Sequence, residues 1–378
     1  MVYVLDKFFT QQLTAIDGVD VDPTASFADL TTLRVGGKPR VTLRCSRPEA
    51  AVAALRYLEK EKVPFIVVGG GSNLLVSDGE VDVVAVVLDF AVVDMDTETG
   101  LVRAQAGAVW DEVVAESVAQ SLGGIECLSG IPGTVGAVPV QNVGAYGAEI
   151  SEVLTRVRLY NLRTDADEWV PVSDLDLAYR YSNLKFTGRA VVLEVELQLT
   201  TDGLSRPLRF GQLTDAPGER RPVAQVREEV LALRRGKGMV LDAADHDTWS
   251  AGSFFTNPVV ESSVADAVQD KVRATLGDAL ADRMPRHPAT ASAQGEPSPH
   301  EKLSAAWLID NAGFTKGYPG SGPATLSTKH TLALTNRGNA TAADIVALAR
   351  TIRDGVREAF GVELVPEPVW LGVSMDED

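Results

Sequence analysis

Two glycine-rich segments constrain the fold of this chain more than any other feature. The longer one, residues 128–149 with the sequence LSGIPGTVGAVPVQNVGAYGAE, holds five glycines and two prolines. That content is too high for a helix, yet the intervening residues are too apolar for a solvated linker. The sequence therefore predicts an ordered loop packed against another part of the molecule, in which Gln141 and Asn142 are either ligand contacts or simple loop amides.

The shorter glycine segment, residues 69–73, follows the apolar, β-branched run PFIVV. Consecutive glycines after a strand let backbone amides approach an anion without a Cβ clash, and Ser72 and Asn73 add side-chain donors. Neither the Rossmann nor the P-loop pattern is present, because the next residues, LLVSD, continue as an apolar strand. A pyrophosphate site and a tight turn are both open here, although two such segments in one chain favour a large dinucleotide such as a flavin cofactor.

Apolar spacing predicts alternating helices and strands along 378 residues, enough for two or three domains. The predicted helices cover 49–62, 110–124, 223–238, 267–284 and 344–361. The predicted strands cover 83–90, 101–109, 156–162, 190–199 and 331–336. This mixture predicts an α+β fold with a boundary near residues 235–245, and the Pro-, Ser- and Ala-rich segment 285–302 predicts a surface excursion.

Charge and composition exclude several classes of protein. The chain has 35 Lys and Arg against 52 Asp and Glu, a formal charge of -17, which disfavours nucleic-acid binding and requires a local basic cluster for any anionic ligand. Cys45 and Cys127 with four histidines show no metal-ligand spacing, so we expect buried thiols and no metal site. Because the N-terminus lacks signal-peptide features and no stretch reaches 18 apolar residues, we expect a cytoplasmic protein without membrane contact.

Four residues are of types suited to chemistry. Arg180 lies between two tyrosines, where stacking can hold a guanidinium while it binds a carboxylate or phosphate. Ser253 precedes two phenylalanines that would shield its hydroxyl, without the pattern of a hydrolase nucleophile. Glu363 and Glu367 lie in an apolar C-terminal run, where desolvation would raise a carboxyl pKa. A surface or turn role is the alternative for each residue.

Seven segments form an ordered set that runs over nearly the whole chain. They are TTLRVGG (31–37), VVGGGSNLLVSD (67–78), the stretch 128–150, YRYSNLKF (179–186), AGSFFTNPVV (251–260), AAWLIDNAGFTKG (305–317) and PEPVWLG (366–372). Together they closely resemble the UDP-N-acetylenolpyruvoylglucosamine reductase family. The resemblance implies a flavoenzyme of peptidoglycan precursor synthesis, in which NADPH reduces FAD and hydride passes to the enolpyruvyl ether of a UDP-sugar, giving UDP-N-acetylmuramate.

The resemblance also implies an α+β fold in three domains. Two of them form an FAD-binding fold of the vanillyl-alcohol-oxidase type, which we place at 1–88 and 89–235. A substrate-binding domain follows at 236–372, with a tail at 373–378. No His or Cys lies between Cys45 and Cys127, which argues against covalent attachment near the glycine segment, so we expect non-covalent FAD. We also expect a monomer.

Carried over residue by residue, the resemblance implies three catalytic groups. Ser253 matches the serine that protonates the substrate carbon after hydride attack, and Arg180 and Glu367 match the groups that stabilise the enol form of the substrate carboxylate. Implied cofactor contacts are Gly69, Gly70, Gly71, Ser72, Asn73, Gly130, Ile131, Pro132, Gly133, Thr134 and Gly136. Implied substrate contacts are Gln141, Phe210, Lys237, Asn257 and His330.

Two departures from the family pattern limit this transfer. Phe210 stands where members with a long insertion place a tyrosine over the substrate, so a hydroxyl contact is lost there. The segment after Pro285 is also longer than the compact family connection. Two other functions compete with the reductase: another oxidoreductase of the same flavin fold, and a nucleotide-binding protein that kept the loops without turnover.

Overall fold

The computed structural model describes residues 7–289 and 299–376. The chain divides into two compact units, and each contains separate stretches of sequence. Unit 1 contains Met1–Leu30, Gly37–Ser72 and Gly79–Leu241, and unit 2 contains Thr31–Gly36, Asn73–Asp78 and Asp242–Asp378. Two of the motif segments, TTLRVGG and VVGGGSNLLVSD, therefore start in one unit and end in the other.

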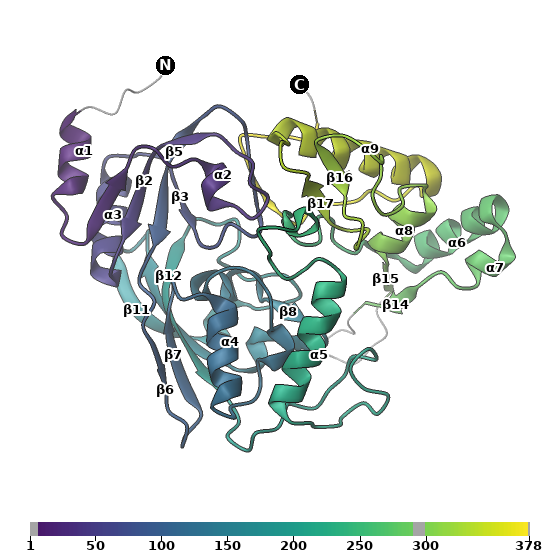
Figure 1. The fold of residues 1–378 in the computed structure, drawn as a ribbon, viewed down its shortest axis with the longest axis horizontal. Helices are drawn as coiled ribbons and strands as arrows, with labels where there is room; N and C mark the ends of the chain where they lie inside the picture. Colours follow the sequence, from purple (N-terminus) through teal and green to yellow (C-terminus); the bar gives the residue numbers. More distant parts are fainter. Residues whose placement is uncertain (1–6, 290–298, 377–378) are drawn as a thin grey trace. The chain divides into compact units, whose positions relative to one another are not determined.

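A four-stranded sheet forms the first layer of unit 1, in the order β1-β2-β5-β3 (Figure 1). Its strands are β1 (Val19–Asp22), β2 (Lys38–Cys45), β5 (Glu80–Leu88) and β3 (Phe65–Val68). The pairs β2–β5 and β3–β5 are parallel, and α3 (Pro48–Lys60) connects β2 to β3. Burial of parallel strands explains the continuous apolar run of β5. The short helices α1 (Lys7–Thr14) and α2 (Phe27–Leu30) complete this part.

An antiparallel sheet of order β11-β10-β12-β7-β6 forms the second layer of unit 1. Its strands are β11 (Ala166–Pro171), β10 (Leu154–Asn161), β12 (Ala190–Gln198), β7 (Leu101–Gln105) and β6 (Val93–Met95). The helices α4 (Trp110–Ala119) and α5 (Val223–Gly236) belong to the same unit. Residues 128–149 form 3-10 turns and the short pair β8 (Gly144–Ala145) and β9 (Ala148–Glu149), so the predicted ordered loop is confirmed.

Unit 1 contains two large hydrophobic clusters, one around the mixed four-stranded sheet and α3 and one around the antiparallel sheet and α4. Both support a division of unit 1 into two FAD-binding parts, and the boundaries placed at 88 and 235 stay a proposal. Burial raises the pKa of the Cys45 and Cys127 thiols to about 12. The prediction of buried thiols is therefore confirmed.

Unit 2 is built around α9 (Ala342–Phe360), whose apolar face enters its hydrophobic cluster. The other helices are α6 (Ser262–Leu276), α7 (Asp278–Ala281) and α8 (Ala305–Asn311). The antiparallel strands are β13 (Val259–Glu261), β15 (His300–Leu303) and β14 (Arg286–Pro288), with the separate pair β16 (Ala324–Leu326) and β17 (Leu334–Asn336). The strands β4 (Leu74–Val76) and β18 (Val369–Leu371) pair in parallel.

The predicted surface excursion at 285–302 is wrong at both ends, because β14 and β15 form there. Arg286 holds the two strands together by donating two hydrogen bonds to Glu301, at 2.6 and 2.8 Å. Its guanidinium also pairs with Asp266 on α6, which fixes the strand pair to that helix. Residues 290–298 of the excursion lie outside the described residues.

Glu196 on β12 is buried at the centre of a charged cluster. Arg156 donates to both of its carboxylate oxygens at 2.7 and 2.8 Å, and Arg103 donates to Oε2 at 2.8 Å. Hydrogen bonds from Arg156, and then from Arg103 and Thr155, outweigh desolvation and lower the pKa of Glu196 to about 2. This pKa lies below that of an unfolded glutamate. The ionised Glu196 cluster therefore stabilises the folded state fully above about pH 4.3, and this contribution is lost as the pH falls toward 2.

We expect Glu196→Gln to lower the free energy of unfolding at pH 7 by on the order of 3 kcal/mol, with the deficit shrinking between pH 4 and pH 2. Urea unfolding at a series of pH values measures this deficit. Glu168→Gln, which changes an exposed carboxylate on β11 of the same sheet, is the control and should have little effect. A deficit that is independent of pH would contradict the assignment.

Candidate active site

The two glycine segments meet in unit 1, with no room for side chains between them. A Cβ atom on Gly70 would lie 2.6 Å from Cα of Gly133, and one on Gly69 would lie 2.6 Å from Oγ1 of Thr134. Ser72 donates its hydroxyl to the carbonyl of Pro132 at 2.9 Å, which ties the segments together. The two loops therefore form a single surface of backbone groups.

The second segment is also held from its other side by the strand end at residues 106–110. Trp110 donates its amide to Gly133 at 3.0 Å, Val135 donates to Ala108 at 2.9 Å, and the amide of Gly136 reaches Ala106 at 2.9 Å. A Cβ on Gly136 would lie 2.7 Å from Cβ of Ala106. The loop is thus fixed on both sides, while Ile131 packs against the antiparallel-sheet cluster.

These residues fit a flavin dinucleotide. The cradle is made of backbone where a single Cβ would collide, which is the construction that lets amides approach a pyrophosphate. Gly71 has φ +58°, a left-handed conformation that glycine adopts without strain. The hydroxyl hydrogen of Ser72 is used within the cradle, so Ser72 is a structural link and can offer a ligand only its lone pairs.

Arg180 lies in the same unit as the glycine segments and is held by the second of them. Its guanidinium donates to the carbonyl of Gly144 at 2.7 Å and lies 5.3 Å from the ring centroid of Tyr179. The backbone of Arg180 has φ +54°, a region that costs a non-glycine residue of order 1 kcal/mol. Ser182 donates to the carbonyl of Val140, next to Gln141, so the structure brings the predicted residues Arg180 and Gln141 onto neighbouring segments.

Asn142 makes structural contacts, which fits the loop-amide alternative of the two that the sequence left open. It is 1% exposed, and its side-chain amide donates to Glu149 at 2.8 Å and to the carbonyl of Ala178 at 3.1 Å. Its side-chain oxygen accepts the amide of Ser151 at 3.2 Å. The polar atoms of Asn142 therefore form hydrogen bonds that join the second glycine segment to the turn that holds Arg180.

Lys237 and Phe210 both contact Tyr146, a residue that the sequence reasoning missed. The phenyl ring of Phe210 packs edge-on at 5.3 Å from the ring of Tyr146, and the Lys237 ammonium lies 5.8 Å from the centroid of the same ring. Burial, with repulsion from the buried Arg234, lowers the pKa of Lys237. Tyr146 lies within the second glycine segment, between Gly144 and Gly147. An aromatic residue between two glycines is the sequence feature that could have identified it.

In unit 2, Ser253 and Glu367 lie on paired backbone segments. The amide of Glu367 donates to the carbonyl of Phe254 at 2.9 Å, and Phe255 forms a bridge with Pro366. Phe254 and Phe255 are 0% and 1% exposed, which confirms that two buried aromatics follow the serine. Asn73 reaches the same place, because its side-chain amide donates to the carbonyl of Glu367 at 3.4 Å. Glu363, the other predicted carboxyl, is exposed.

His330 and Asn257 also belong to unit 2. His330 lies in the turn before β17, so the strand predicted from 331 begins only at Leu334. Leu332 in this turn contacts the segment that holds Ser253, because its carbonyl accepts the amide of Phe254 at 2.8 Å. Asn257 accepts the amide of Ala305 at 3.0 Å and so fixes the start of α8.

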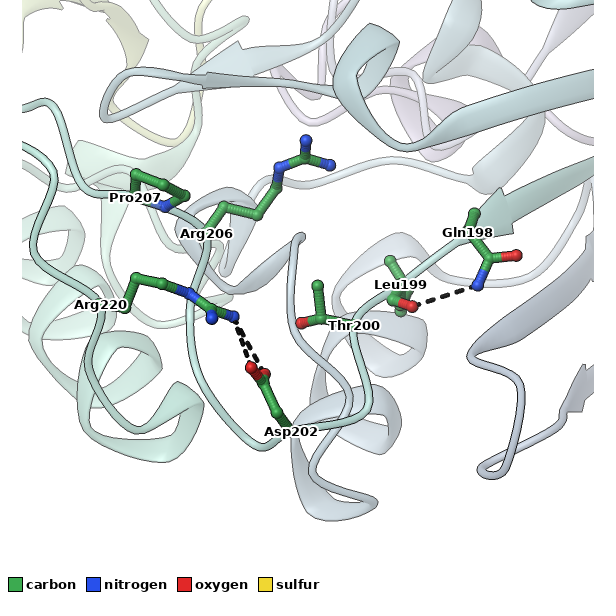
Figure 2. A pocket seen from close by; sticks show the side chains of 7 residues that line it. All are labelled: Gln198, Leu199, Thr200, Asp202, Arg206, Pro207 and Arg220. Carbon is green, nitrogen blue, oxygen red and sulfur yellow. Dashed lines mark hydrogen bonds and ion pairs between the residues drawn. The ribbon is translucent and has the colours of Figure 1, made fainter.

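A separate depression of about 480 Å³ on unit 1 is lined by none of the predicted site residues. Figure 2 shows its lining: Gln198, Leu199, Thr200, Asp202, Arg206, Pro207 and Arg220. Arg220 pairs with Asp202 at 2.8 Å, and Arg206 donates to the carbonyl of Glu152 at 2.7 Å. Both guanidinium groups are thus engaged within the protein, and the depression is separate from the predicted site.

Two further findings concern residues 7–289 and 299–376. Within these ranges, no group of three or more His, Cys, Asp or Glu side chains could hold a metal ion. No helix there is long and apolar enough to cross a membrane.

Comparisons with known proteins show which families the chain resembles. The C-terminal domain model of UDP-N-acetylenolpyruvoylglucosamine reductase matches residues 244–371, and an FAD-binding domain model matches residues 39–164. The reductase of Corynebacterium glutamicum strain R is 59% identical, covering 99% of this chain and 100% of that protein. The Nocardia farcinica reductase is 52% identical, covering 97% and 93%.

A solved structure shows the same fold. The crystal structure of UDP-N-acetylenolpyruvylglucosamine reductase from Thermus caldophilus superimposes with a TM-score of 0.61 at 24% identity, covering 93% of this chain and 98% of that one. The α+β class with an FAD-binding fold of the vanillyl-alcohol-oxidase type is confirmed.

The FAD-binding match and the cradle of paired glycine segments define an FAD-dependent oxidoreductase, as predicted. With a relative at 59% identity over the full length, the chain belongs to the UDP-N-acetylenolpyruvoylglucosamine reductase family.

We expect Gly70→Ala to weaken FAD binding by roughly 10- to 100-fold, because its methyl group would overlap the Gly133 backbone and force the two loops apart. The ratio of flavin to protein absorbance after purification measures the loss. Gly236→Ala is the control, since no atom outside its own helix lies within 4 Å of the added methyl. Stoichiometric FAD in Gly70→Ala would contradict the cradle.

Proposed function

We propose that this chain catalyses the NADPH-dependent reduction of UDP-N-acetylenolpyruvoylglucosamine to UDP-N-acetylmuramate. Membership of the family over the full length of the chain is the observation that carries the proposal. When bound, FAD supplies hydride transfer between a nicotinamide and a substrate carbon. The chain itself binds and orients the substrate, stabilises charge and delivers a proton.

Ser253 is the proposed proton donor. Addition of hydride to C3 of the enolpyruvyl group leaves an enol form of the carboxylate, and its collapse requires a proton at C2. The half-buried position of Ser253 before the buried Phe254 and Phe255 supports this role, because bulk water reaches a half-buried hydroxyl less freely than an exposed one. The hydroxyl gives up its proton to C2 and recovers one from solvent in the next cycle.

Arg180 and Glu367 are the proposed stabilisers of the enol form. Charge accumulates on the substrate carboxylate during hydride addition, and a preoriented guanidinium lowers the energy of that state. The hydrogen bond from Arg180 to Gly144 and its stacking on Tyr179 support preorientation. The contact of the Glu367 amide with Phe254 supports a role for its carboxyl close to Ser253.

Lys237 is the proposed contact for the UDP diphosphate. The cation lies beside Arg234 and over Tyr146, so unit 1 has the local basic cluster that an anionic substrate requires. Both NADPH and the substrate are polyanions, and the formal charge of -17 repels them at long range. The cluster acts at short range, where the charge of the whole surface matters less.

We further propose that the enzyme is a monomer in the cytoplasm, binding small molecules and neither nucleic acid nor membrane. An anaerobic spectrum tests the main proposal. Addition of NADPH should bleach the flavin absorbance, and addition of UDP-N-acetylenolpyruvoylglucosamine should restore it. Bleaching without recovery would contradict the proposed substrate, and no bleaching would contradict NADPH as the reductant.

For Ser253→Ala, we expect the flavin to bleach with NADPH as in the wild type, while recovery on adding substrate slows by roughly 10²- to 10⁴-fold, the usual contribution of a general acid. Stopped-flow absorbance separates these two steps. Ser263→Ala, at an exposed position on α6, should match the wild type in both steps. A normal recovery rate in Ser253→Ala would remove this serine from the mechanism.

For Lys237→Ala, we expect KM for the UDP substrate to rise by roughly 10- to 100-fold with FAD content unchanged, because the contact is made equally in the ground and transition states. Steady-state kinetics on enzyme of known flavin content measure this effect. Arg235→Ala is the control, since it removes an exposed cation two positions away on α5. An unchanged KM would show that Lys237 does not bind the diphosphate.

A further inference from the structure

Asp111, in the first turn of α4, joins three parts of unit 1. Its Oδ1 accepts the amide of Gly130 at 2.6 Å. Both carboxylate oxygens also accept from Arg227 on α5, at 2.6 and 3.0 Å. The side chains of Asp111 and Arg227 are 32% and 16% exposed, so the pair is largely shielded from solvent. One carboxylate therefore links α4, α5 and the loop that flanks the flavin.

Gly130 is the first residue of that loop, and it is packed tightly against α5. A Cβ on Gly130 would lie 2.9 Å from Cδ2 of Leu231, 3.0 Å from Cγ2 of Val240 and 3.4 Å from Nε of Arg234. Its φ of +70° requires glycine as well. Gly130 therefore packs against α5 and against Val240 beyond it, and Asp111 contacts both Gly130 and α5.

The far end of α5 carries the basic cluster. Lys237 caps the helix, and Arg234 donates to the carbonyl of Met239 at 2.7 Å, which fixes the turn that follows. Arg227 lies on the same helix, and α4 and α5 run side by side (Figure 1). A helix is a stiff element, so an anchor at Arg227 also restrains the position of Lys237.

We propose that Asp111 is a positioning residue that couples the flavin cradle to the substrate cation. It holds the start of the flavin-flanking loop through Gly130 and holds α5, with Lys237 at its end, through Arg227. The substrate half of this inference rests on the proposed function of Lys237. The cofactor half rests only on the contacts of Gly130 and on the FAD-binding fold.

Three variants separate the two contacts. Asp111→Ala removes both. Asp111→Asn keeps an oxygen acceptor for the Gly130 amide but places an amide group against Arg227 and loses the ion pair. Arg227→Met removes the ion pair and leaves the Asp111 carboxylate on Gly130. Glu229→Gln is the matched control, because Glu229 on α5 accepts from Arg221, which precedes the helix, on both carboxylate oxygens. Its other hydrogen-bond partner, Gln225, also lies outside the loop.

Equilibrium ultrafiltration of the holoenzyme measures FAD affinity from the flavin that passes the membrane, independently of turnover. We expect the dissociation constant for FAD to be roughly 10- to 100-fold larger in Asp111→Ala than in the wild type. In Asp111→Asn, Arg227→Met and Glu229→Gln, we expect it to stay within about threefold of the wild-type value.

Steady-state kinetics at saturating FAD test the other contact. We expect KM for UDP-N-acetylenolpyruvoylglucosamine to rise roughly 3- to 10-fold in all three Asp111 and Arg227 variants, with kcat within about twofold, and to stay unchanged in Glu229→Gln.

Two results would overturn the proposal. Wild-type FAD affinity in Asp111→Ala would show that the carboxylate only stabilises the fold, as would equal losses in the Glu229→Gln control. A wild-type KM in both Asp111→Asn and Arg227→Met would show that Asp111 does not position Lys237 through α5. If the wild-type enzyme does not reduce the UDP substrate, the proposed function fails, and the ultrafiltration result still decides the role of Asp111.

Discussion

The close approach of two glycine backbones is the constraint on which the cofactor site depends. At Gly70 and Gly133 the chains are so near that one added carbon would fall 2.6 Å from a backbone atom. Such contact excludes side chains and leaves amides and carbonyls as the surface that a ligand meets. The mixed four-stranded sheet supplies the first segment, which follows β3, and the strand end at residues 106–110 supports the second, so both sheets of unit 1 support this contact.

Charge is distributed to suit polyanionic ligands in spite of the acidic surface. The formal charge of -17 is carried mainly by exposed carboxylates, many of them paired with arginine. Two carboxylates form contacts that hold the fold together. Glu196 joins neighbouring strands, and Asp111 joins α4 and α5 to the flavin-flanking loop. Burial and Arg234 lower the pKa of Lys237, whose ammonium donates to Gln212 at 3.3 Å and lies over the ring of Tyr146.

Sequence reasoning succeeded where local chemistry decides structure. Helical spacing predicted α3, α4, α5 and α9, and the apolar runs predicted β3, β5 and β12, because burial of one face requires that periodicity. It failed where a distant partner decides. The strands β14 and β15, which Arg286 and Glu301 join, were not foreseen. The two alternatives for Asn142 stayed open until the structure showed its amide on Glu149 and Ala178. Tyr146 and Arg234 gained importance only from the side chains that surround them.

The sequence by itself determined the α+β class, the family and the two glycine segments, since ordered motifs and periodicity are properties of the chain alone. Only the tertiary structure decided that these segments touch, that Ser72 donates to Pro132, and that Asp111 binds Gly130 and Arg227 together. The physical reason is the separation along the chain. Periodicity depends on residues a few positions apart, whereas a contact between residues 111 and 227 depends on how whole helices pack.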